Sequence, residues 1–111
     1  MKPETSDLTK LACQPCRGSL PKLTEAEIQK HAAEVPKWAV VDAQRIERTF
    51  KFPDFASALE FVNRVGELAE REQHHPDIHL SYGKVRVELW THKVHGLSVN
   101  DFILAAKIDR I

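Results

Sequence analysis

Histidine side chains are concentrated in one short part of this sequence. Five of its six histidines lie within a short stretch, and they are His74, His75, His79, His92 and His95. Imidazole is the side chain whose unperturbed pKa lets it both give and take protons near neutral pH. The cluster therefore predicts acid/base chemistry, with zinc bound by histidines as the alternative.

The adjacent pair His74-His75 is expected at the end of a helix, because Pro76 biases the residue before it towards extended backbone. Neighbouring imidazoles at such a corner project in different directions, so they can contact two parts of one ligand but cannot easily share a metal ion. On its own the pair would equally suit a solvated helix end. His92 ends a later strand, and that strand end can lie on the same side of the sheet as the helix end.

Other catalytic patterns are not visible in the sequence. It has no serine or cysteine nucleophile with an evident partner, no glycine-rich phosphate loop and no HExxH spacing. Glu70 and Asp101 lie near the histidines along the chain. This combination suits a reaction that consists of proton transfer alone.

The two cysteines lie together in the segment Cys13-Gln-Pro-Cys16. A zinc knuckle would need a second pair of ligands, and a thioredoxin-like motif would need flanking βαβ elements. Residues 1–22 contain several prolines and no periodicity, so we interpret them as an irregular N-terminal arm with two reduced thiols. A metal-binding or redox role for this arm is the alternative.

Residues 23–111 are predicted to form one domain that positions the histidines. Capping boxes at Thr24/Glu27 and Ser98/Asp101 open its first and last helices. The expected elements are a helix over 24–33, strands over 38–41 and 45–52, a helix after Asp54, strands over 78–82 and 84–91, and a helix from 98. This order predicts an α+β fold, α-β-β-α-β-β-α, in which helices pack on one face of a four-stranded antiparallel sheet.

Apolar spacing predicts which faces of these elements are buried. The strand over 84–91 alternates, so Val85, Val87, Leu89 and Thr91 should face the core, and Trp90 and His92 the other side. The central helix should pack on the sheet through an apolar stripe made of Phe55, Ala58, Leu59, Phe61, Val62, Val65, Leu68 and Ala69.

Composition limits the partners of this 111-residue chain. Its 16 Lys and Arg balance its 16 Asp and Glu, so net charge favours neither nucleic acid nor an anionic membrane as a partner. No apolar stretch has the length of a signal peptide or a membrane span, which predicts a cytoplasmic protein. The exposed edges of the expected sheet could pair between copies, so a homo-dimer or tetramer is expected.

The motif residues together resemble the pterin-4a-carbinolamine dehydratases. The resemblance rests on Glu70-x-x-x-His74-His75-Pro76, then Tyr82, Thr91-His92 and Gly96-Leu97-Ser98-x-x-Asp101. Trp38, Phe50-Lys51-Phe52 and Asp54-Phe55 also look like that family, so the resemblance extends from about Leu23 to the C-terminus. Ile78 and Val94 depart from the residues that many or some members have there.

The resemblance implies an α+β enzyme that dehydrates 4a-hydroxytetrahydropterin to a quinonoid dihydropterin, with no metal or other cofactor. This step recycles the cofactor of aromatic amino-acid hydroxylases. His74, His75 and His92 would be the catalytic residues, with His74 and His92 transferring protons and His75 orienting the pterin. The residues implied to bind the substrate are Trp38, Glu70, Pro76, Thr91, Lys93, Val94 and Asp101.

Several of these assignments have structural alternatives. Asp101 could serve only as the capping partner of Ser98, or could serve both purposes, and Trp38 could be a core residue. Tyr82 is expected to pack in a hairpin, while His79 and His95 are expected to be solvated. Animal members of the family also act as dimerisation partners of a transcription factor, so a non-catalytic binding module is the alternative function. The presence of all three motif histidines favours the enzyme.

Overall fold

The computed structural model describes residues 8–13 and 21–111. The predicted α+β class and the order α-β-β-α-β-β-α are confirmed. Two short 3-10 helices, η2 and η3, are present in addition. In chain order the elements are η2 (Leu8–Lys10), α1 (Glu25–Ala32), β1 (Ala39–Val41), β2 (Arg45–Lys51), α2 (Phe55–Glu72), β3 (Asp77–Ser81), β4 (Lys84–Leu89), η3 (His92–Val94) and α3 (Val99–Ile108).

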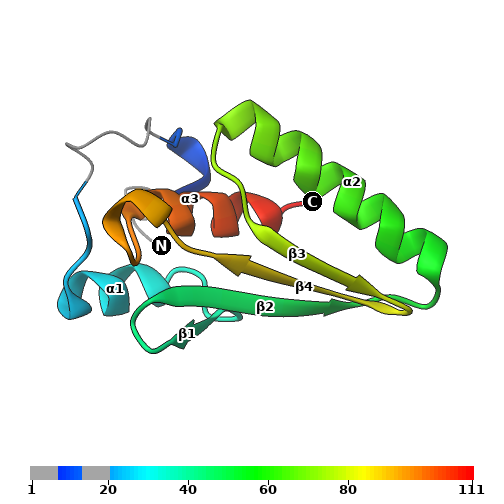
Figure 1. Cartoon of the computed structure of the whole chain (residues 1–111), viewed down its shortest axis with the longest axis horizontal. Helices are drawn as coiled ribbons and strands as arrows, with labels where there is room; N and C mark the ends of the chain where they lie inside the picture. The colour runs from blue at the N-terminus through cyan, green and yellow to red at the C-terminus, as the bar shows by residue number, and fades with distance from the viewer. Residues whose placement is uncertain (1–7, 14–20) are drawn as a thin grey trace, which may run out of the picture.

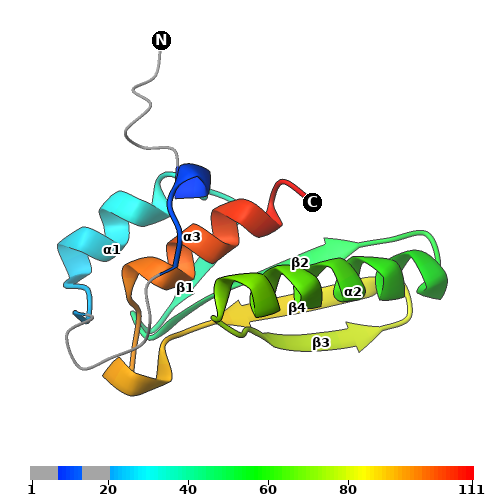
Figure 2. The same ribbon diagram turned by 90° about the horizontal axis from the view of Figure 1, so that it is seen from above.

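The four strands form one antiparallel sheet in the order β1-β2-β4-β3, so β2 and β4 are central. Helices α2 and α3 lie over the same face of this sheet, and α1 packs beside α3 (Figures 1 and 2). Val85, Val87 and Leu89 face the helices and are fully buried, as the alternation predicts. The sheet therefore has one apolar face that forms the core and one polar face.

Helix α2 begins and ends at residues that satisfy its terminal backbone groups. The Asp54 side chain accepts a hydrogen bond from the Ser57 N–H at 2.8 Å, and this bond holds the pKa of Asp54 below its ordinary value. At the other end Gln73 adopts the left-handed conformation, with φ of 57°, and its N–H donates to the Ala69 carbonyl. This left-handed residue turns the chain sharply just before His74.

The apolar stripe of α2 packs on the sheet only in part. Ala58, Phe61 and Val65 are buried, whereas Phe55 and Leu59 are 45% and 42% exposed. The prediction that the whole stripe faces the sheet is therefore wrong for these two residues. At about 100° per residue they lie on the flank of the helix, well away from the centre of its buried face.

Part of the N-terminal arm packs on the domain. Residues Leu8–Lys10 form η2, which lies beside α3, and Leu8 is 4% exposed (Figures 1 and 2). The sequence predicts only an irregular arm here. A single 3-10 turn of three residues is too short to show a periodicity that would reveal it. Cys13 is half-buried, while Cys16 lies outside the described residues.

No helix within residues 8–13 and 21–111 combines the length and the apolar character that crossing a bilayer requires.

Candidate active site

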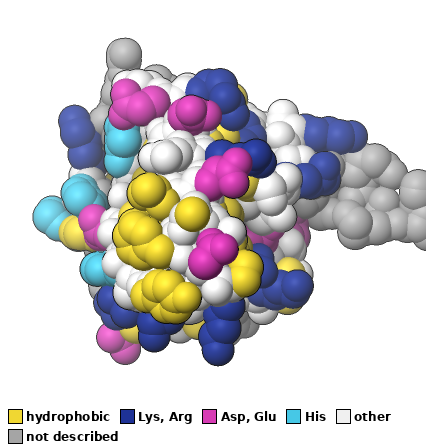
Figure 3. All heavy atoms as spheres, turned by 90° about the vertical axis from the view of Figure 1, so that its right-hand side faces the viewer, with side chains coloured by type: hydrophobic (Ala, Val, Ile, Leu, Met, Phe, Trp, Pro, Cys, Tyr) yellow, Lys and Arg dark blue, Asp and Glu magenta, His cyan; other side chains and the backbone are white. Residues whose placement is uncertain are grey.

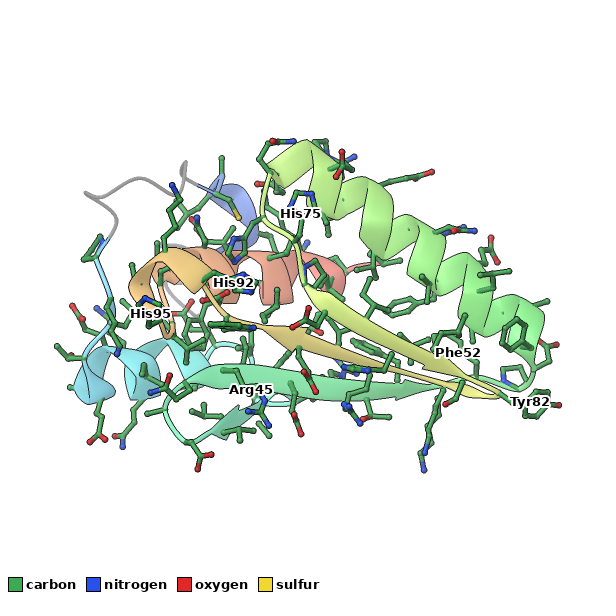
Figure 4. All side chains as sticks on the ribbon, in the orientation of Figure 1. Arg45, Phe52, His75, Tyr82, His92 and His95 are labelled. Atoms are coloured by element: carbon green, nitrogen blue, oxygen red, sulfur yellow. The ribbon has the colours of Figure 1, made fainter. Side chains whose placement is uncertain are left out.

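A pocket of about 190 Å³ lies between the end of α2 and η3. Its lining residues are Gln73, His74, His75, Trp90, His92 and Lys93. The three histidines of the predicted site therefore come together, although they are up to 18 positions apart in sequence. Figure 4 shows His75 and His92 in the same region, with Phe52 and Tyr82 at the opposite end of the molecule.

His74 is the buried member of the three. The left-handed turn at Gln73 brings its N–H to the Ala69 carbonyl at 3.2 Å, so the residue is fixed to the last turn of α2. Its Nε2 lies 2.7 Å from Oδ1 of Asp101 on α3, and the two side chains are 5% and 0% exposed. This carboxylate fixes the orientation of the imidazole.

Asp101 is held in turn by a small buried network. Its Oδ2 accepts hydrogen bonds from Thr91 Oγ1 at 2.8 Å and from the Ser98 N–H at 3.0 Å. The hydroxyls of Thr91 and Ser98 lie 2.7 Å apart. Asp101 thus caps α3, as its spacing from Ser98 predicts, and its other carboxylate oxygen binds His74. Thr91 is fully buried and does not line the pocket, and its hydroxyl holds this carboxylate in place.

His75 stands between two hollows. Its Nε2 lies 2.6 Å from Oε2 of Glu70, and both side chains are exposed. His75 also lines a second hollow of about 580 Å³, together with Gly66, Glu67, Ala69, Glu70, Pro76 and Ile78. His75 is therefore the one histidine of the three that borders both spaces.

His92 is positioned by an aromatic neighbour that the sequence analysis did not assign to the site. The rings of Trp90 and His92 have centroids 3.9 Å apart and are tilted by 40°. Trp90 Nε1 donates to Asp77 Oδ2 at 3.3 Å, which orients the indole. Trp90 and His92 are two positions apart, so the alternation of an extended chain places both side chains on the same side. This spacing is the feature of the sequence that indicates their contact.

Some of the predicted binding residues lie elsewhere. Trp38 is 4% exposed in the core, where its Nε1 donates to Asp109 Oδ1 at 2.9 Å and its ring meets Phe50 edge-on. Val94 is half-buried in η3 and does not line the pocket, whereas its neighbour Lys93 does.

Three further residues of the sequence analysis lie outside the pocket. Tyr82 is 75% exposed at the tip of the β3–β4 hairpin, far from His75 (Figure 4). His79 is exposed on β3 with its Nε2 3.5 Å from Glu88. His95 is exposed and ends η3 in the left-handed conformation, with φ of 54°.

Within residues 8–13 and 21–111, no three or more His, Cys, Asp or Glu side chains are grouped so that they could hold a metal ion. The Cys13-Gln-Pro-Cys16 segment is described only as far as Cys13, so its predicted metal-binding or redox alternative lies partly outside these ranges.

Comparison with known proteins finds a family that matches most of this chain. The family described as "Pterin 4 alpha carbinolamine dehydratase" matches residues 21–111. A Methylococcus capsulatus protein named "Putative pterin-4-alpha-carbinolamine dehydratase" is 48% identical over 97% of this chain and 96% of its own length. A protein of the same name from Rubrobacter xylanophilus is 46% identical over 96% of this chain and 99% of its own length.

A solved structure shares the fold. The crystal structure named as a "transcriptional coactivator/pterin dehydratase from Brucella Melitensis" superimposes with a TM-score of 0.76 and 34% sequence identity. The match covers 81% of this chain and 97% of that one. The sequence matches, the shared fold and the histidine pocket agree, and this chain belongs to the pterin-4-alpha-carbinolamine dehydratase family of lyases.

Proposed function

We propose that this protein dehydrates 4a-hydroxytetrahydropterin to quinonoid dihydropterin by histidine acid/base catalysis. The observation that carries the proposal is the convergence of three imidazoles on one pocket, each with a defined neighbour that orients it. Asp101, Glu70 and Trp90 are these neighbours.

The reaction needs one proton delivered and one proton removed. An imidazolium protonates the hydroxyl on C4a, the C4a–O bond breaks, and water leaves. A neutral imidazole removes the proton from N5, whose electron pair forms the double bond to C4a. The two imidazoles exchange protonation states in each turnover, and solvent restores them. Histidine suits both steps because its two forms coexist near neutral pH.

We assign proton transfer to His74 and His92 and orientation of the ring to His75. His74 is held by a buried carboxylate, which fixes its ring in one orientation. His92 is exposed, so it can return its proton to water. His75 borders both hollows, which suits contact along the pterin rather than at one atom.

A direct assay of carbinolamine dehydration tests this proposal. We expect His74→Ala and His92→Ala each to lower kcat by about 10²-fold or more, the usual contribution of a positioned acid or base. His75→Ala should act mainly on KM, because a uniform binding contact stabilises the ground and transition states alike. His79→Ala, an exposed histidine outside the pocket, is the matched control. Full activity in all three folded pocket variants would refute the acid/base proposal.

We propose that catalysis requires no metal, because positioning and proton transfer are sufficient for this dehydration. Exhaustive chelation should then leave the rate unchanged. Loss of activity that added zinc restores would favour the zinc alternative.

We also propose that the protein forms a homo-dimer or tetramer. Strands β1 and β3 are the edges of the sheet, and an unpaired edge can pair with another chain. The end of the molecule formed by the start of α2 and the β3–β4 hairpin exposes Phe55, Leu59 and Tyr82. Figure 3 shows apolar side chains gathered on this end and bordered by charged ones, as at many contact surfaces.

A further inference from the structure

The last residue of α2, Glu72, holds three parts of the chain together behind the pocket. Its Oε2 lies 2.6 Å from Lys107 Nζ on α3, and its Oε1 accepts the backbone N–H of Cys13 at 3.0 Å. The Glu72 and Lys107 side chains are only 10% and 18% exposed. A shielded ion pair of this kind is far less screened by water than a surface pair.

Glu72 and His74 attach the same end of α2 to the same helix. Lys107, the partner of Glu72, lies six positions after Asp101, the partner of His74, on α3. At 1.5 Å per residue these two attachments are about 9 Å apart along the helix axis. One attachment alone would let the end of α2 pivot about it, whereas two fix the direction in which His74 leaves the helix.

Cys13 adds a third contact at the same place. Its thiol donates a hydrogen bond to the Asn100 carbonyl at 3.6 Å, beside Asp101, while its N–H binds Glu72. Cys13 thus connects α2, through Glu72, to α3, through the Asn100 carbonyl beside Asp101. We call Glu72, Lys107 and Cys13 the clasp.

The charges of the clasp are stable at neutral pH. Burial raises the pKa of the Cys13 thiol to about 12, with the Glu72 charge as the next cause. Burial by itself raises the pKa of Glu72, but the Cys13 N–H and Lys107 outweigh it and hold that pKa below its ordinary value. Glu72 is therefore ionised and Cys13 neutral where the enzyme would work.

We propose that Glu72 is a positioning residue for proton transfer, which with Lys107 and the Cys13 N–H sets the orientation of His74 against Asp101. The inference rests on the proposed dehydratase function for its kinetic consequence. Its geometric consequence, a fixed His74 ring, does not depend on that function.

The test uses Glu72→Gln in the full-length chain. Glutamine has the same shape and can still accept the Cys13 N–H, but it loses the charge that binds Lys107. We expect kcat to fall about tenfold with KM nearly unchanged, since small misplacement of a reacting group costs rate. Lys107→Met should lower kcat to the same extent. Lys107→Arg keeps the positive charge and should therefore retain most of the kcat of the parent protein.

A matched control comes from the same helix. Glu60→Gln removes an exposed ion pair with Arg64, whose side chains are 68% and 60% exposed, and should leave kcat unchanged. The imidazole ¹H and ¹⁵N resonances of His74, followed against pH, should move in Glu72→Gln and Lys107→Met but not in Glu60→Gln.

The outcomes separate this inference from the proposed function. If the clasp variants lose stability while kcat and the His74 resonances stay as in the parent protein, Glu72 is only a structural contact and the inference is overturned. If the parent protein shows no dehydration at all, the proposed function fails, and the His74 resonances alone still decide the role of Glu72.

Discussion

Two of the pocket histidines are paired with carboxylates in opposite surroundings. Asp101, beside His74, is fully buried and accepts two further hydrogen bonds, whereas Glu70, beside His75, is 74% exposed. Water screens the exposed pair and competes for its hydrogen bonds, whereas the buried pair is shielded from water. The two carboxylates should therefore differ greatly in their effect on stability.

Removal of each carboxylate measures this difference. Asp101→Ala removes from the buried network the carboxylate that binds His74, Thr91 and the Ser98 N–H, and we expect the free energy of unfolding to fall by about 3 kcal/mol or more. Glu70→Ala should cost less than about 1 kcal/mol. Urea unfolding of both variants provides the measurement, and equal losses would contradict the buried network.

The Cys13 thiol should react slowly with electrophiles in the folded protein. Only the thiolate is nucleophilic, and burial raises the pKa of this group to about 12. In a Cys16→Ser background we expect alkylation at pH 8 to be about 10²-fold or more slower in the folded chain than in guanidinium. Because the pKa of Cys13 is higher in the folded than in the unfolded chain, this thiol stabilises the fold below its unfolded pKa. That contribution to the free energy of unfolding is lost as the pH rises through the folded pKa. Equal rates in both states would show that the thiol is open to water.

Much of the pocket follows from residue types and spacing. His74, His75 and His92 could be predicted because proton transfer favours imidazole and because the helix and strand ends meet on one side of the sheet. The carboxylate network could be predicted only in part, since the Ser98/Asp101 spacing indicated a cap but not its contact with His74. Trp38 was placed near the pterin by resemblance, yet its indole N–H binds Asp109 inside the core, a partner that the sequence pattern does not reveal.

At the scale of elements, the order and type of the α-helices and strands from residue 23 on could be predicted from their periodicity and their cap or turn signals, whereas the 3-10 helix η3 could not. The residues at which these elements end could be predicted less exactly. Strand β4 was expected to reach residue 91 but ends at Leu89, because Thr91 pairs with Gly96 instead and the chain turns into η3. That pairing, like the docking of η2, depends on tertiary contacts rather than on local sequence.

The β1–β2 turn contains a strained position that can be tested. Asp42 and Ala43 both have φ of 54°, as the central residues of a type I′ turn do, and the Gln44 N–H closes the turn on the Val41 carbonyl at 2.9 Å. Alanine in the left-handed region costs about 1–2 kcal/mol, and glycine avoids this cost.

We therefore expect Ala43→Gly to raise the free energy of unfolding by about 0.5–1 kcal/mol, after the loss of one methyl contact is subtracted. Thermal unfolding measures the change. Ala39→Gly on strand β1, where φ is not positive, is the matched control and should lower stability by about 0.5–1 kcal/mol. A loss of stability in both variants would mean that the turn stores no strain.

At the scale of the whole molecule, the pocket and the apolar end lie far apart. The histidines are at the end of α2, whereas Phe55 and Leu59 are near its start, an 18-residue helix away (Figures 1 and 4). An interface at the apolar end would therefore leave the pocket entrance open. Association and catalysis can then be separated by mutation.

The apolar end should join copies of the chain through the flank of α2. Leu59→Lys places a charge on that flank, where it would be desolvated on association, so we expect the mass measured by light scattering to fall to that of one chain of 12.7 kDa. Because Leu59 lies on the flank of α2 and is 42% exposed, the fold itself should remain intact. Val40→Lys, on strand β1 at 39% exposure, tests one of the two sheet edges. Dissociation by Val40→Lys but not by Leu59→Lys would move the interface to β1, and a parent protein that is monomeric at all concentrations would refute the oligomer.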